Sequence, residues 1–80
     1  MRLPRDVRGE DLVRALAQFG YRATRQTGSH VRLTTETRGT HHITVPRHKA
    51  LRVGTVAAIV RDVAVHFEMD EDELRSRLFS

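Results

Sequence analysis

The stretch Gln-Thr-Gly-Ser-His at residues 26–30 reads as a tight turn that leads straight into a strand, and it decides how the rest of the chain is arranged. Gly28 can adopt the positive φ that so tight a reversal needs. From the histidine onward, Val31 and Leu33 alternate with polar residues, which is typical of a strand with one buried face. His30 is in register with the polar positions, so we expect its imidazole on the open face of a sheet. A surface histidine with no role beside a hairpin turn is the other interpretation.

The residues before this turn predict a helix that ends at a glycine. Glu10 and Asp11 place negative charge in a first helical turn, where it interacts favourably with the helix dipole. Apolar residues then repeat at helical spacing, and Gly20 is the residue type that commonly follows the last turn of a helix. We therefore expect a helix over about residues 10–19, preceded by a loose lead-in over residues 1–8.

Residues 21–26, 30–35 and 41–45 have the composition and alternation of three strands. They are joined by the glycine turn and by residues 36–40, and connections this short join antiparallel neighbours. We expect a meander in which Pro46 closes the last strand. The face expected to pack against helices carries Tyr21, Ala23, Arg25, Val31, Leu33, Ile43 and Val45. The open face is expected to carry Arg22, Thr24, Gln26, His30, Arg32, Thr34, His42 and Thr44.

The second half of the chain predicts a basic connector and two further helices. The connector spans residues 47–54, and Thr55 is the expected N-cap of a helix. Asp70 with Glu73 has the pattern of a capping box that starts a short final helix. The expected fold is α+β: an α-β-β-β-α arrangement with a three-stranded antiparallel sheet, helices on one face, and a short C-terminal helix. The apolar residues expected to pack these helices are Val56, Ile59, Val60, Val63, Ala64, Phe67, Leu74 and Leu78.

Composition narrows the class of protein further. Residues 1–80 are expected to form one domain, and the absence of cysteine excludes disulfides and thiolate metal sites, which fits a reducing cytoplasm. We expect no secretory signal and no membrane span, because no apolar run is long enough. Residues 1–61 hold twelve Lys or Arg against four Asp or Glu, whereas residues 62–80 hold two against six. Since almost all basic residues are arginine, which binds phosphate bidentately, an anionic polymer is the first partner to consider. An arginine-rich, solvated surface without a partner is the alternative.

A series of short motifs in this sequence resembles one protein family. The series consists of Tyr21, residues 25–30, the segment Ile-Thr-Val-Pro-Arg-His-Lys at residues 43–49, and Gly-Thr-Val at residues 54–56. Together these motifs resemble the HicA (YcfA-like) mRNA interferase toxins over about residues 9–63. Residues 64–80 depart from the family pattern, because the second helix continues there without the usual glycine turn.

The resemblance implies both a fold and a function. The implied fold is similar to double-stranded-RNA-binding domains. The implied activity is that of a cytoplasmic ribonuclease that cleaves translated mRNA in a type II toxin–antitoxin system of the stress response. A HicB antitoxin is the implied protein partner. The histidine of the Gly-Ser-His turn, here His30, is the implied catalytic residue.

The chemistry of RNA cleavage suits a histidine in this position. The 2′-hydroxyl beside each phosphodiester is a built-in nucleophile, and an imidazole can take its proton without a metal or cofactor. We expect His30 to act as a general acid/base on the 2′-hydroxyl and the phosphate. Candidates for the second proton donor and the nearby positive charge are His42, Arg32, Arg47, His48 and Lys49, with a structural or phosphate-positioning role favoured for His48. Supporting or RNA-binding roles are expected for Gly28, Ser29, Arg22, Arg25 and Arg32.

Other functions remain open from the sequence. A non-catalytic RNA-binding module would use the same basic face without cleaving its ligand. The face could equally dock an acidic protein, and this role coexists with a toxin whose antitoxin covers His30. A metal site made by His41, His42 and His48 is disfavoured, because neighbouring strand residues point to opposite faces and no carboxylate is adjacent.

Overall fold

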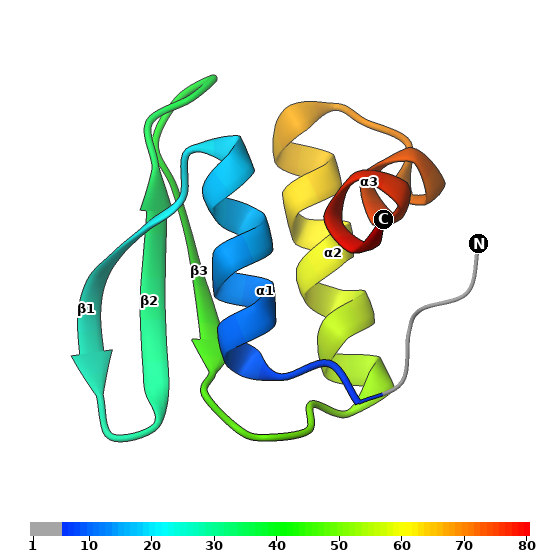
Figure 1. The fold of residues 1–80 in the computed structure, drawn as a ribbon. Coiled ribbons are helices and arrows are strands. Elements are labelled where there is room, and N and C mark those ends of the chain that lie inside the picture. Colours follow the sequence, from blue (N-terminus) through cyan, green and yellow to red (C-terminus); the bar gives the residue numbers. More distant parts are fainter. Residues whose placement is uncertain (1–5) are drawn as a thin grey trace.

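The order of helices and strands along the chain is the predicted one. The computed structural model describes residues 6–80, so the part of the predicted lead-in at residues 1–5 lies outside the described residues. The α+β class and the α-β-β-β-α order with a short C-terminal helix are confirmed (Figure 1). The elements are α1 (Gly9–Leu16), the 3₁₀ turn η1 (Ala17–Phe19), β1 (Arg22–Thr27), β2 (His30–Thr35), β3 (His41–Pro46), α2 (Val53–Phe67) and α3 (Glu71–Phe79).

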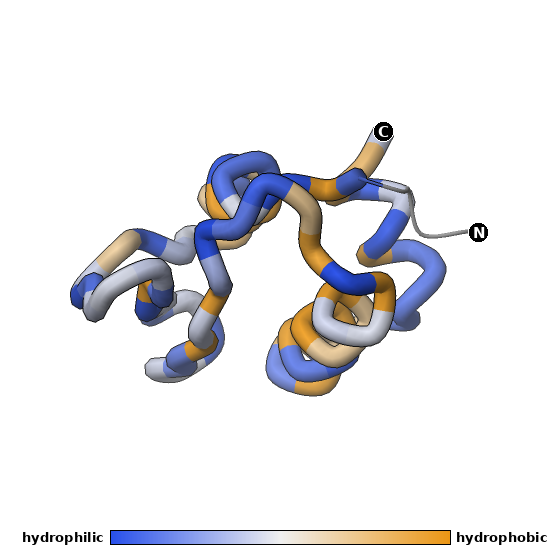
Figure 2. Tube along the Cα trace, turned by 90° about the horizontal axis from the view of Figure 1, so that it is seen from below, coloured by the Kyte–Doolittle hydropathy of each residue, from blue (hydrophilic) through white to orange (hydrophobic). Residues whose placement is uncertain are grey.

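The three strands form one antiparallel sheet in the order β1-β2-β3. The helices lie on one side of this sheet, and Figure 2 shows the most hydrophobic stretch in α2. Both α1 and α2 pack against β3, whereas α3 packs against α1 and α2 rather than against the sheet. The opposite face of the sheet is covered by no helix of the described chain, and it remains open to solvent.

The buried core confirms the predicted apolar positions of β2, β3, α2 and α3. Two buried residues extend this core beyond the prediction: Val7, which precedes α1, and Leu51, which lies in the connector. The Leu51 N–H donates to the Val7 carbonyl oxygen at 2.8 Å. Val7 is therefore packed into the core, contrary to the predicted loose lead-in, and the connector is hydrogen-bonded to it. The confirmed core positions are Val31, Leu33, Ile43, Val45, Val56, Ile59, Val60, Val63, Ala64, Phe67, Leu74 and Leu78.

Strand β1 contains a β-bulge that the sequence did not predict. Ala23 pairs with Leu33 and Arg25 pairs with Arg32, so Thr24 is an extra residue on β1. An extra residue reverses the alternation of side chains beyond it. Arg25 therefore lies on the open face, and its predicted place on the packed face was wrong.

The remainder of β1 follows from the same bulge. Gln26 pairs with Val31, which places it on the helix side rather than on the predicted open face. Every residue of β1 is exposed, including Ala23, which was wrongly predicted to be covered by helices. The reason is that β1 is an edge strand, while α1 and α2 pack over β3 at the opposite edge.

Helix α2 begins earlier than predicted. Its N-cap is Arg52, which has an extended backbone and no side-chain capping bond, so the prediction of Thr55 as N-cap was wrong. The Val56 N–H already donates to the Arg52 carbonyl oxygen at 3.1 Å. Because Leu51 is held in the core, the chain turns into the helix directly after it.

Helix α2 ends without a glycine, and Glu68 takes the conformation that glycine usually adopts there. Glu68 has a φ of +53°, in the left-handed region. Arg38, in the β2–β3 hairpin, donates from Nη2 to Glu68 Oε2 at 2.8 Å and from Nη1 to the Phe67 carbonyl oxygen at 3.3 Å. The hairpin tip therefore provides a hydrogen-bond donor for a backbone carbonyl at the C-terminal end of α2.

Helix α3 begins where predicted. Asp70 is its N-cap, and Asp70 Oδ2 accepts hydrogen bonds from the backbone N–H groups of Asp72 at 3.0 Å and Glu73 at 3.2 Å. Capping of this kind satisfies the free N–H groups of a first helical turn. The acidic cluster at residues 70–73 thus has a structural role in starting α3.

Candidate functional site

His30 is presented by a two-residue turn at the end of the β1–β2 hairpin. Thr27 pairs with His30, and Gly28 and Ser29 between them make the reversal. Gly28 has a φ of +57°, while an added Cβ would meet nothing within 4 Å, so the backbone conformation rather than space requires glycine. The Arg47 N–H donates to the Ser29 carbonyl oxygen at 2.6 Å, which ties the turn to the end of β3. His30 is exposed on the open face, where the strand pattern predicted it.

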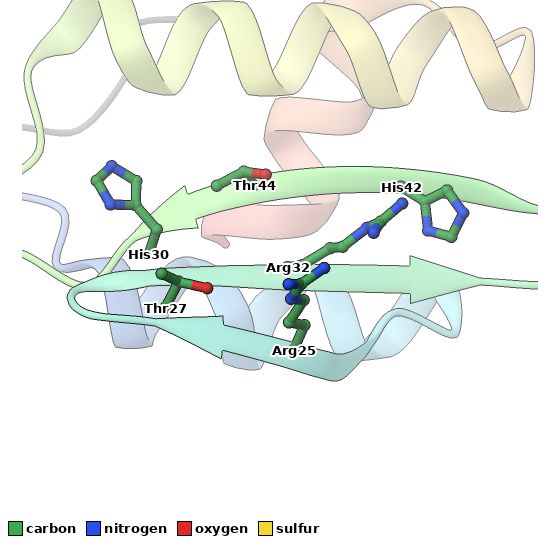
Figure 3. Close-up of a pocket in the computed structure, with 6 residues that line it drawn as sticks. All are labelled: Arg25, Thr27, His30, Arg32, His42 and Thr44. Carbon is green, nitrogen blue, oxygen red and sulfur yellow. The ribbon is translucent and has the colours of Figure 1, made fainter.

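An open hollow of about 390 Å³ lies on this face of the sheet beside His30 (Figure 3). Side chains from all three strands line it, and none of them is acidic. Two are arginines, two are histidines and two are threonines, so the hollow combines positive charge with hydrogen-bonding groups. We call it the sheet hollow; its lining residues are Arg25, Thr27, His30, Arg32, His42 and Thr44.

Arg25 and Arg32 stand opposite each other on neighbouring strands. Like charges in opposed positions destabilise a sheet. Within residues 6–80, neither guanidinium has a hydrogen bond or an ion pair. A phosphate bound beside them would relieve this repulsion, and guanidinium groups bind phosphate in a bidentate manner. The sheet hollow therefore favours an anionic ligand.

His42 lies at the opposite end of the sheet hollow from His30 (Figure 3). It pairs with Thr34, which is four residues along β2 from His30, so the two histidines are roughly 13 Å apart. His42 Nδ1 is 2.8 Å from Thr34 Oγ1, which is itself 2.8 Å from Thr24 Oγ1. At this separation the two imidazoles cannot contact the same small group.

A second hollow, of about 280 Å³, lies where α1 meets the connector after β3. Arg47 donates from Nη2 to Glu10 Oε1 at 2.6 Å and from Nη1 to Gln26 Oε1 at 3.0 Å, so its charge is already paired. Lys49 is exposed and has no partner among the described residues. We call this space the connector hollow; its lining residues are Arg8, Glu10, Arg47, His48 and Lys49.

His48 brings the connector hollow next to His30. The centroids of the two imidazole rings are 6.3 Å apart, with an interplanar angle of 69°. His48 Nε2 is 3.4 Å from Ser29 Oγ, in the turn that presents His30. The predicted site residues thus line the sheet hollow or the connector hollow, or form the turn between them. Arg22 is the exception, because it pairs with Thr34 at the far end of β1 and lines neither hollow.

The comparison with protein families gives one match. The family model for the HicA toxin of bacterial toxin–antitoxin systems matches residues 9–65, which is more than half of the chain. The chain belongs to the HicA toxin family. No curated protein and no solved structure gives a significant match. Membership makes this chain the toxin of a toxin–antitoxin pair and implies an antitoxin partner, and the family is generally one of ribonucleases.

One residue that positions the connector hollow of this HicA toxin was missed from the sequence. A Cβ added at Gly9 would lie 2.1 Å from the Pro46 carbonyl oxygen and 2.7 Å from the Arg47 Cα. The Gly9 N–H donates to the His48 carbonyl oxygen at 2.9 Å. Glycine is therefore what allows α1 to approach the end of β3. The position of Gly9 just before two acidic residues signals a helix start, but it does not signal this contact.

The other two histidines of the HicA toxin, His41 and His66, lie on the helix side of the sheet, where His41 is part of a hydrogen-bonded chain. The Tyr21 hydroxyl is 2.7 Å from His41 Nδ1, and His41 Nε2 is 3.1 Å from Asp62 Oδ1. Burial, and then the charge of Asp62, raises the pKa of Tyr21, so its hydroxyl stays protonated. Because the Asp62 carboxylate accepts from Nε2–H, the Nδ1 of a neutral His41 carries no proton and accepts from the Tyr21 hydroxyl. His41 also stacks on His66, with ring centroids 4.4 Å apart. His41 and His42 thus point to opposite faces, as predicted.

Residues 6–80 contain no group of three or more His, Asp or Glu side chains arranged to hold a metal ion. No helix of this part of the chain combines the length and the apolar character that crossing a membrane requires.

Proposed function

We propose that this HicA toxin is a metal-independent endoribonuclease that cleaves mRNA, with His30 as its general acid/base. The observation that carries the proposal is an exposed imidazole at the edge of a hollow that contains two unpaired arginines and no acidic side chain. Family membership supports it, since the family is generally one of ribonucleases.

The proposed reaction needs only groups that RNA and this face supply. His30 accepts the proton of the 2′-hydroxyl, and the resulting oxygen attacks the neighbouring phosphorus. A new O2′–P bond forms as the P–O5′ bond breaks, which leaves a 2′,3′-cyclic phosphate and a 5′-hydroxyl. Arg32 is two residues from His30 on β2, or about 7 Å along the strand, and Arg25 stands opposite it. Their charges would stabilise the negative charge that develops on the phosphate oxygens.

Recognition of the RNA would depend mainly on its phosphates. No Phe, Tyr or Trp side chain lines either hollow, and Tyr21 is buried on the helix side, so the large aromatic rings that stack best on bases are missing there. Binding through arginine and phosphate alone gives little sequence preference and a marked dependence on salt. We therefore propose broad cleavage of accessible mRNA rather than selection of a long sequence.

The antitoxin partner is proposed to be of the HicB type and to act by covering the sheet hollow. An acidic surface would complement the unpaired arginines there and would exclude the phosphate backbone. The purified complex should then leave mRNA intact, and cleavage by the complex at the rate of the free toxin would contradict this mode of inhibition.

The decisive experiment compares the wild type with His30→Ala and His30→Gln on an mRNA in the presence of a chelator. We expect cleavage by the wild type, loss of at least about 100-fold in both variants, and retained RNA binding. His66→Gln is the matched control, because His66 donates to the Thr37 carbonyl oxygen away from both hollows and glutamine can do the same. Binding without cleavage by the wild type would instead support the non-catalytic RNA-binding module.

A further inference from the structure

The structure places a second imidazole beside His30 from a different part of the chain. His48 lies in the connector after β3, while His30 begins β2, and their rings face each other edge to face. We propose that His48 is a second catalytic residue, the general acid that protonates the leaving 5′-oxygen. This inference rests on the proposed ribonuclease activity and assigns the proton donor that the reaction requires.

The two rings are close enough for their exposed edges to reach one phosphate. In an in-line reaction the attacking and leaving oxygens lie on opposite sides of phosphorus, and each proton-transfer group must come within about 3 Å of its own oxygen. The two imidazoles must therefore flank the phosphate without touching. A centroid separation of 6.3 Å keeps the rings out of direct hydrogen-bonding contact, and a phosphate seated across their exposed edges would be within reach of one nitrogen of each ring. His42, roughly 13 Å from His30 along β2, is too distant for this role.

Three backbone contacts hold His48 in this position. Its own carbonyl oxygen accepts from the Gly9 N–H at 2.9 Å, and the preceding Arg47 N–H donates to the Ser29 carbonyl oxygen at 2.6 Å. Leu51, three residues later, is buried and bonded to Val7. The connector is therefore attached to α1 on one side and to the turn that presents His30 on the other.

The contact that the His48 side chain makes with the turn is compatible with proton donation from Nε2. Its Nε2 lies 3.4 Å from Ser29 Oγ, and Ser29 is the residue directly before His30. An imidazolium whose Nε2–H donates to this hydroxyl has its proton directed toward the turn. The leaving 5′-oxygen would replace the hydroxyl as acceptor when RNA is bound. Ser29 is then a positioning residue that aims His48 in the free protein.

The proton balance of the step is complete with these two residues. The proton of the 2′-hydroxyl goes to His30 as the O2′–P bond forms, and the His48 proton goes to the 5′-oxygen as the P–O5′ bond breaks. His30 ends protonated and His48 neutral, and exchange with solvent restores both. Because His48 also lines the connector hollow, the RNA on the 5′-hydroxyl side of the cut would continue toward Lys49.

The test uses a leaving group that needs no protonation. After the cut made by the wild type has been mapped, an oligonucleotide is made with sulfur in place of the bridging 5′-oxygen at that position. We expect His48→Ala and His48→Gln to slow cleavage of the normal RNA by about 10²–10⁴-fold but to cleave the sulfur-containing RNA within about tenfold of the wild type. His30→Ala should remain slow on both, because its role is at the 2′-hydroxyl.

The pH profile gives an independent readout. With an acid and a base both required, kcat/KM of the wild type should rise and then fall with pH, and the variants of His48 should lose the fall at high pH. Equal loss by the His48 variants on both RNAs, with an unchanged profile, would overturn the assignment and leave a structural role. Full activity of these variants on normal RNA would overturn it as well. A wild type that does not cleave RNA would instead remove the proposed ribonuclease itself.

Discussion

Replacing Gly9 with alanine should destabilise this HicA toxin strongly, although alanine is the better helix former. The added Cβ would lie 2.1 Å from the Pro46 carbonyl oxygen, 2.7 Å from the Arg47 Cα and 3.0 Å from the Pro46 carbonyl carbon. All three neighbours are backbone atoms, so no side-chain rotation can make room. Either α1 or the end of β3 must move, and the Gly9 hydrogen bond to the His48 carbonyl oxygen is stretched or lost.

The expected magnitude follows from these contacts. Overpacking of a well-packed site costs about 1–3 kcal/mol, and the lost hydrogen bond costs about 1 kcal/mol more. The lower unfolded-state entropy of alanine offsets about 0.4–1 kcal/mol. The net loss of roughly 1–4 kcal/mol is a large part of the total stability of about 4–12 kcal/mol for a chain of this length. At about 4–8 °C per kcal/mol, the Tm should fall by roughly 5–30 °C.

Urea and thermal unfolding measure this change, and Gly54→Ala is the matched control. Gly54 is the second residue of α2, its added Cβ would meet nothing within 4 Å, and its φ is negative. Alanine there should raise the free energy of unfolding by about 0.4–1 kcal/mol. A Gly9→Ala protein as stable as Gly54→Ala would refute the claim that close approach requires glycine at the start of α1.

Two further predictions concern the buried tyrosine and the unpaired arginines. Burial raises the pKa of Tyr21, so folding favours the protonated form of its hydroxyl. The contribution of this group to the free energy of unfolding should therefore be constant below the ordinary tyrosine pKa of about 10 and fall above it. The Tyr21→Phe variant should lose less stability at alkaline pH than the wild type. At neutral pH the free energy of unfolding of the same variant should be lower by about 1–2 kcal/mol, because His41 Nδ1 loses its donor. Urea titrations of the wild type and the variant at pH 7 and pH 11 measure both effects. An equal loss of stability at pH 11 in the two proteins would contradict the raised pKa of Tyr21. Arg25→Ala and Arg32→Ala should each weaken RNA binding and lower the slope of log Kd against log salt by about 1, whereas Arg61→Ala, which removes a charge paired with Glu71 on the helix side, should not. Equal slopes for all three variants, measured by fluorescence anisotropy, would argue against phosphate binding in the sheet hollow.

The sequence predicted the sheet best where one face of a strand is apolar. In β2 and β3 the alternation of apolar and polar residues leaves one register that buries Val31, Leu33 and Val45, and His30 is placed by that register. In β1 the residues on both faces are exposed, so burial of apolar side chains does not favour one assignment of residues to the two faces over the other. The alternation of residues along β1 therefore does not predict the bulge at Thr24. The bulge depends on the pairing of β1 with β2, in which Thr24 has no partner.

Two of the features that the sequence did not reveal assemble the candidate site. The bulge turns Arg25 to the open face, where it stands opposite Arg32 and adds a second unpaired charge beside His30. The close approach at Gly9 holds the connector so that His48 reaches the same turn from the other side. Both are contacts between segments far apart in sequence, and neither alters the local residue pattern that predicts helices and strands. Since like charges opposed across two strands cost stability, an anion bound in the sheet hollow would relieve this cost. RNA binding should consequently raise the Tm of the His30→Ala protein at low salt, and the increase should disappear in the Arg25→Ala, Arg32→Ala double variant on the same background.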